Sequence, residues 1–248
     1  MLITTILPLM TALTLAVGGH GLHSDTARVP PGDPCGAGPG KGTGNPCNGN
    51  RGNSGRNGNS GRTDSAIPAI PKPDGGDRGA YIMQIGADHE GQIDQEDGGQ
   101  FARVIQRGTA NEAHIEQRGA GRHFADLSQS GDRNAFDLRQ EGADDTVLYA
   151  SQSGEANRAS VAQAQTGAIY NAALVSQNGD RNTLFLAQDG SDNQAILTQT
   201  GSDNLMTATQ LGDGNRLQWE QTGSNLSDLM IQQDGGAALQ VTQTGPGR

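Results

Sequence analysis

The chain has 248 residues and a formal net charge of −10 at pH 7. Leucine, isoleucine, valine and phenylalanine supply 42 residues, about 17 %, which is too few for the aliphatic core of a compact enzyme. The net charge is too dilute for a fully disordered chain, so interactions other than aliphatic packing must provide order. The acidic balance disfavours nucleic acid and anionic membrane surfaces as partners.

Residues 1–24 are predicted to be a signal peptide. The apolar run from Ile3 to Val17 has the length of a signal-peptide hydrophobic region and is shorter than a membrane span, and small residues follow it. We therefore expect export of the chain and no membrane insertion of its mature form.

Residues 25–80 are rich in glycine, proline and asparagine and have no hydrophobic periodicity. This composition predicts a disordered leader, because the segment has almost nothing to bury. Its two cysteines, Cys35 and Cys47, could close one small disulfide loop in an oxidising compartment. The chain has no Cys-x-x-Cys pair, so a redox or metal site at these residues is not expected.

A repeat occupies residues 81–245. All 22 glutamines of the chain lie at or beyond Gln84, and a Gln-x-Gly signal recurs every 10 to 13 residues to give fifteen units. Within a unit, an asparagine follows five residues after the glutamine, and apolar or small residues follow at seven and nine. These positions share one parity, which predicts a strand with one buried face, and the Gly, Asp and Ser residues between strands predict turns.

Strands of about seven residues joined by turns of about four predict an all-β fold, in which two strands form one rung of a β-solenoid with two parallel in-register sheets. In-register stacking lets each buried amide bond to the identical residue about 4.8 Å above and below, so no thick aliphatic core is needed. One predicted column of amides holds Gln106, Gln129, Gln152, Gln177, Gln199 and Gln221 with Asn111, Asn134, Asn157, Asn182 and Asn204. The other holds Gln117, Gln140, Gln165, Gln188 and Gln210 with Asn171, Asn193 and Asn215.

Several units resemble the curlin repeat of bacterial curli fibre subunits, with matching residue types and spacing. Three of them are Gln106-x-Gly108-x-x-Asn111-x-Ala113-x-x-x-Gln117, Gln152-x-Gly154-x-x-Asn157-x-Ala159-x-x-x-Gln163 and Gln188-x-Gly190-x-x-Asn193-x-Ala195-x-x-x-Gln199. The resemblance implies a secreted functional amyloid that self-associates into extracellular fibres of adhesion and biofilm matrix. It also implies export through the periplasm and a dedicated outer-membrane secretion pore, and partner subunits that include a nucleator.

The turns of the repeat are rich in acidic residues. Acidic turn residues, among them Asp132, Glu155, Asp180 and Asp203, should stack as like charges, stay solvated and slow premature assembly. A calcium solenoid is not expected, because calcium-binding β-solenoids use nine-residue repeats.

A monomeric secreted solenoid with a surface-binding face, adhesin-like or ice-binding, is the alternative. It is suggested by the Thr-x-Thr pairs at Thr198, Thr207 and Thr242. An enzyme is not expected, since no Gly-x-Ser-x-Gly motif occurs and His89, His114 and His123 lack metal-ligand spacing. No cofactor or metal is predicted.

Overall fold

A computed structural model describes residues 67–74, 76 and 78–245. The predicted signal peptide, most of the leader and both cysteines lie outside these residues. The described chain contains fifteen strands: β1 (Gly79–Ala87), β2 (Glu90–Gln95), β3 (Phe101–Thr109), β4 (Glu112–Arg118), β5 (Phe124–Asp132), β6 (Ala135–Gly142), β7 (Thr146–Glu155), β8 (Arg158–Gln165), β9 (Asn171–Asn178), β10 (Thr183–Gly190), β11 (Gln194–Thr200), β12 (Leu205–Leu211), β13 (Arg216–Gly223), β14 (Leu229–Asp234) and β15 (Ala238–Gly245). Within this part of the chain, no helix is long and apolar enough to cross a membrane.

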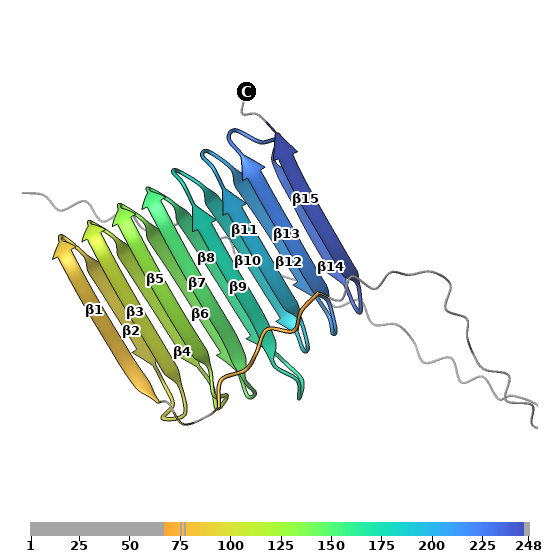
Figure 1. Cartoon of the computed structure of the whole chain (residues 1–248). Helices are drawn as coiled ribbons and strands as arrows, with labels where there is room; N and C mark the ends of the chain where they lie inside the picture. Colours follow the sequence, from red (N-terminus) through yellow and green to blue (C-terminus); the bar gives the residue numbers. More distant parts are fainter. Residues whose placement is uncertain (1–66, 75, 77, 246–248) are drawn as a thin grey trace, which may run out of the picture. The chain divides into compact units, whose positions relative to one another are not determined.

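The strands form two parallel sheets and confirm the predicted β-solenoid. The odd-numbered strands make an eight-stranded sheet in sequence order, here the odd sheet, and the even-numbered strands make a seven-stranded even sheet. Successive strands point in opposite directions and alternate between the sheets, so two consecutive strands make one rung (Figure 1). Strands two apart pair in register, as where Gln84 lies opposite Gln106.

The core is a thin layer between the two sheets, and the alternating burial of each strand produces it. In β5, Ala125, Leu127 and Gln129 are buried, whereas the residues between them are partly exposed. Along the stack the inward aliphatic side chains form one continuous cluster, and buried amides lie beside it. The small aliphatic content is sufficient because only two layers of side chains fill the interior.

The turns depend on glycine at the Gln-x-Gly position. Gly154 has a φ of +113°, and a Cβ built on it would lie 2.0 Å from the carbonyl oxygen of Gly179 in the next rung. The residue before most ladder asparagines is also left-handed without being glycine, for example Ala156 with a φ of +56°. Two left-handed residues separated by one ordinary residue therefore reverse the chain within four or five positions.

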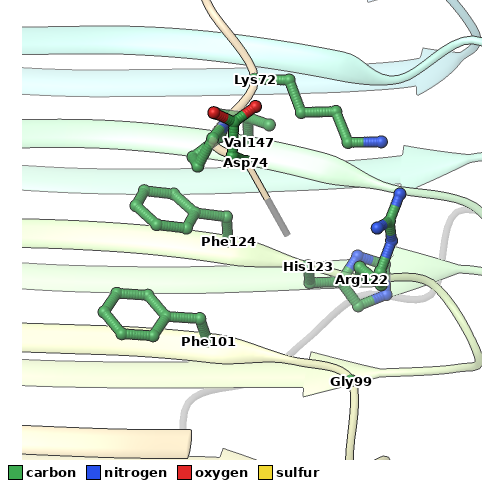
Figure 2. Close-up of a pocket in the computed structure, with 9 residues that line it drawn as sticks. Lys72, Asp74, Gly99, Phe101, Arg122, His123, Phe124 and Val147 are labelled. Atoms are coloured by element: carbon green, nitrogen blue, oxygen red, sulfur yellow. The ribbon is translucent and has the colours of Figure 1, made fainter. Parts of the chain in front are cut away.

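A crossing segment, residues 67–74, lies over the outer face of the odd sheet. Ile70 is only 2 % exposed and packs on Val147 and Ala172, while its backbone N–H donates to Oε1 of Gln194 at 3.1 Å. Lys72 pairs with Asp145, and Figure 2 shows this part of the segment beside the strands that carry Phe124 and Val147.

This order corrects the expectation that the whole of residues 25–80 is disordered. Ile70 lies in a short proline-containing segment with no strand or helix pattern, and its burial depends on the side chains of Val147 in β7 and Ala172 in β9, on which it packs. Strand β1 also begins at Gly79, two residues before the predicted start of the solenoid.

Replacing Gly154 with alanine should destabilise the solenoid by about 3 kcal/mol or more. The change forces a left-handed conformation on alanine and pushes its methyl group against the backbone of the next rung. Urea unfolding of the monomer measures the loss. Gly98→Ala is the control, because a Cβ there meets no heavy atom within 4 Å, and it should change stability by less than about 1 kcal/mol. Equal losses in both variants would contradict this explanation.

Candidate functional site

Two ladders of glutamine side chains run through the solenoid, one on each sheet. In every step the Nε2 of one glutamine donates to the Oε1 of the glutamine in the following rung, at 2.7 to 3.0 Å. The odd-sheet ladder contains Gln84, Gln106, Gln129, Gln152, Gln177, Gln199, Gln221 and Gln243. The even-sheet ladder contains Gln95, Gln117, Gln140, Gln163, Gln188, Gln210 and Gln233.

Every ladder glutamine after Gln84 and Gln95 also connects the two sheets. The Nε2 of Gln106 donates to the carbonyl of Glu90 at 2.9 Å, and the Nε2 of Gln117 donates to the carbonyl of Phe101 at 3.0 Å. These acceptors lie at the start of the neighbouring strand, on the opposite sheet. Because only the NH2 group can donate to a carbonyl, the backbone acceptors fix the orientation of these amides and give the ladder one direction.

Gln165 is not a member of the even-sheet ladder, which corrects the sequence-based assignment. The in-register partner of Gln140 is Gln163, whereas Gln165 lies opposite Gly142 at the start of the turn. There its Nε2 donates to the carbonyls of Gly167 and Ile169 instead. Gln165 is the predicted ladder member because it begins a Gln-x-Gly sequence. Gln163 has no such glycine but lies eleven residues after Gln152, and this regular distance from the preceding glutamine identifies the ladder member correctly.

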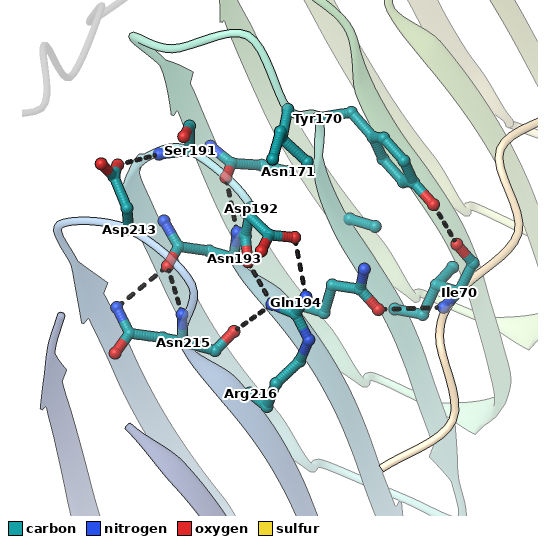
Figure 3. Close-up of polar contacts among 12 residues, drawn as sticks. Ile70, Tyr170, Asn171, Ser191, Asp192, Asn193, Gln194, Asp213, Asn215 and Arg216 are labelled. Atoms are coloured by element: carbon teal, nitrogen blue, oxygen red, sulfur yellow. Dashed lines mark hydrogen bonds and ion pairs between the residues drawn. The ribbon is translucent and has the colours of Figure 1, made fainter. Parts of the chain in front are cut away.

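Two ladders of asparagine side chains lie at the turns, one at each edge of the sheets. Asn134 donates from Nδ2 to the Oδ1 of Asn111 at 3.1 Å, and its Nδ2 also donates to the carbonyl of Gly154 at 2.9 Å. The first ladder continues through Asn157, Asn182 and Asn204, and the second contains Asn171, Asn193 and Asn215 (Figure 3). The asparagine Nδ2 groups therefore donate both to the preceding rung and to a glycine carbonyl of the following rung, whereas glutamine donates to the glutamine of the following rung.

Histidine takes the place of asparagine in the early rungs, which sequence reasoning missed. The Nδ1 of His89 accepts the backbone N–H of Asn111 at 3.3 Å, as an asparagine Oδ1 does elsewhere. His123 is 1 % exposed, its Nε2 lies 2.8 Å from the carbonyl of Arg118, and its Nδ1 lies 2.9 Å from the hydroxyl of Thr146. The carbonyl requires the proton on Nε2, and the neutral ring then accepts from the Thr146 hydroxyl at Nδ1 and imitates an amide with one donor and one acceptor.

Burial lowers the pKa of His123, although the Arg118 carbonyl and the nearby Asp145 charge partly oppose the shift. His114 on the outer face behaves differently. Burial lowers its pKa too, but the hydrogen bonds and charges of Asp137 and Asp94 outweigh that effect and raise it. The two histidines therefore respond to pH in opposite directions.

Arginines neutralise the acidic turns. Asp132 and Glu155 lie in register as the sequence predicts, yet Arg133 pairs with Glu155 from the neighbouring turn. Arg181 pairs with Asp203 at 2.7 Å, and this bond lowers the pKa of the carboxyl. The repulsion expected from stacked acidic residues is thus largely offset along the edges.

The glutamine ladders reach both ends of the described solenoid. At the first rung, no donor among the described residues reaches Oε1 of Gln84 or Gln95. At the last, the Nε2 of Gln243 donates to the carbonyl of Ser227 at 2.8 Å and retains a second N–H. One end therefore presents amide acceptors and the other amide donors, beside the open backbone edges of β1, β2, β14 and β15.

Residues 179–212 match the family model of the curlin-associated repeat. The match extends from the turn before β10 to the turn after β12. No curated protein and no solved structure matches the chain.

Replacing Gln152 with alanine should destabilise the solenoid by about 2–4 kcal/mol. The substitution removes a buried side chain and leaves the Oε1 of Gln177 without its ladder donor. Urea unfolding of the monomer checks this. Gln218→Ala, on the outer face of β13, should stay within about 0.5 kcal/mol of the parent. If both variants unfold alike, the ladder does not stabilise the fold.

Lowering the pH below the ordinary histidine pKa of 6.5 should destabilise the monomer through His123. Since its pKa is lower in the folded chain, the unfolded chain binds the proton first, and stability is lost as pH falls from 6.5 toward the folded value. His123→Asn should remove this loss, measured by urea unfolding between pH 7 and pH 5. His114→Asn is the matched control and should retain it. A His123→Asn profile as steep as the parent's would contradict the assignment.

Proposed function

The chain carries a curlin-associated repeat, and from this premise we propose that it is a secreted structural subunit that polymerises end to end into extracellular curli-type amyloid fibres. Such fibres serve adhesion and form biofilm matrix in the family it resembles. By the same resemblance, its partners are further copies of itself, related fibre subunits or a nucleator, and a secretion pore.

The complementarity of the two ends carries the proposal. The first rung offers the Oε1 acceptors of Gln84 and Gln95, and the other end carries the Nε2 groups of Gln233 and Gln243, which continue the same ladder direction. Gln243 retains an unbonded N–H, while Gln233 already donates to the carbonyls of Arg216 and Ala237 and would share a proton with the next copy, as Gln106 does between three acceptors. The end strands also leave a row of backbone N–H and C=O groups open. A second copy stacked on either end pairs both sets of groups, and it leaves the same ends open again, so growth has no built-in limit.

The role is structural rather than catalytic. The buried polar residues of the ladders are engaged with one another and with backbone carbonyls, which leaves them no reacting partner. They hold rungs together, and the same bonds between molecules would hold a fibre together.

The Thr-x-Thr pairs give less support to a monomeric binding face. Thr198 lies on β11 in the odd sheet and Thr207 on β12 in the even sheet, so the pairs are divided between opposite faces. Within the odd sheet, Glu220 stands between Thr198 and Thr242. They therefore do not form one continuous flat array.

Purified chain should show a lag in thioflavin-T fluorescence that sonicated fibres abolish, and the fibres should diffract at about 4.8 Å along their axis. Gln243→Glu should slow seeded elongation at least about tenfold, because the carboxylate cannot donate to the next copy. Thr242→Glu adds the same charge on the outer face of the same strand and should elongate nearly as the parent does. Persistent monomer in the parent chain would overturn the proposal.

A further inference from the structure

The number of strands determines how one copy can sit on the next. The described chain has eight strands in the odd sheet and seven in the even sheet. The last full rung consists of β13 and β14, and β15 then adds half a rung to the odd sheet alone. The place above β14 in the even sheet is the next position along the solenoid path.

The two sheets are interchangeable by a half-turn about the stacking axis. Their strands point in opposite directions (Figure 1). The strands of both sheets have the same inward parity, and all of them except β2 and β8 carry the Gln-x-Gly signal at the ladder glutamine. A half-turn therefore maps a strand of one sheet onto the direction and the facing of the other.

We propose that adjacent copies in the fibre are related by a half-turn, so that β1 of one copy pairs with β14 of the preceding copy and β2 pairs with β15. This inference rests on the proposed function and specifies its contact. In this arrangement the odd sheet of one molecule continues as the even sheet of the next, and every position along both sheets is filled.

Without the half-turn, β1 would pair with β15, and the place above β14 would stay empty at each junction. The backbone N–H and C=O groups of β14 that face the stack would then be enclosed between two molecules without partners. Buried backbone groups are rarely left unpaired, so the arrangement with a gap is disfavoured.

The side chains at the ends fit the half-turn as well. Alignment of Gln84 with Gln233 places Tyr81 beside Met230, and these two residues are 56 % and 75 % exposed in the single molecule. A methionine thioether next to an aromatic ring is a favourable contact. The same alignment places Ile82 on Ile231 inside the core.

The second contact of the junction, between β2 and β15, brings polar side chains together on the outer face. Alignment of Gln95 with Gln243 places Gln92 beside Gln240 on the outer face and Ile93 on Val241 inside. Without the half-turn, the exposed ring of Tyr81 would lie beside the amide of Gln240 instead. The half-turn thus brings Tyr81 to Met230 instead of Gln240 and keeps apolar side chains together inside both sheets, whereas on the outer face Met83 and Ile85 lie opposite Gln232 and Asp234.

Thiol cross-linking within assembled fibres tests the pairing. In a chain with Cys35→Ser and Cys47→Ser, one variant carries Tyr81→Cys with Met230→Cys, and its matched control carries Tyr81→Cys with Gln240→Cys. The paired residues lie at opposite ends of one molecule, so a link between them joins two copies. After treatment with the short thiol cross-linker dibromobimane and dissolution in formic acid, the Met230 variant should yield a series of covalent oligomers. The Gln240 control should yield mainly monomer.

Cryo-electron microscopy of unsubstituted fibres gives a second readout that does not depend on the cysteine variants. Fifteen half-rungs predict a rise of about 36 Å per molecule combined with a half-turn, in addition to the gradual twist of the sheets. Cross-linking of the Gln240 pair, or a helical symmetry without the half-turn, would overturn the inference while leaving fibre formation intact. Failure of the parent chain to form cross-β fibres would overturn both.

Discussion

Everything in this solenoid depends on the rule that a buried amide must be hydrogen-bonded. A glutamine inside a thin core has one oxygen and two N–H groups to satisfy. Parallel stacking places another glutamine in the rung on either side, one as donor and the other as acceptor. The backbone carbonyls of the opposite sheet take the remaining N–H. A slip of one residue would break all of these bonds together and turn the amides toward solvent, and a slip of two would place each amide opposite an apolar side chain. The ladders therefore fix the register more strictly than aliphatic contacts could.

The same bonds give the molecule a direction. Glutamine donates toward the C-terminal end in every step of its ladders, whereas the asparagines at the turns donate to both neighbouring rungs. The glutamine ladders carry this one direction to the two ends of the described chain. Assembly is therefore a continuation of the fold, in which one molecule supplies to the next what each rung supplies to its neighbour.

The irregular places show what the repeat tolerates. Histidine and threonine replace asparagine in the early rungs because a neutral imidazole or a hydroxyl can also offer one donor and one acceptor. The crossing segment packs on Val147 and Ala172, where the outer face of the odd sheet is apolar. This added contact holds successive rungs together from outside, beside the irregular turn at residues 166–170.

The sequence by itself determined the strands, the turns and the two-strand rung, because parity and spacing are local properties that every unit repeats. It also indicated which glutamines and asparagines form the ladders, except that Gln163 takes the position assigned to Gln165. Only the tertiary structure decided the direction of the ladders, the role of His123 and the burial of Ile70. These depend on residues about 22 to 124 positions apart that meet only when rungs stack. The interchangeability of the two sheets likewise became visible only in three dimensions, because it is a symmetry of stacked strands rather than of a single unit.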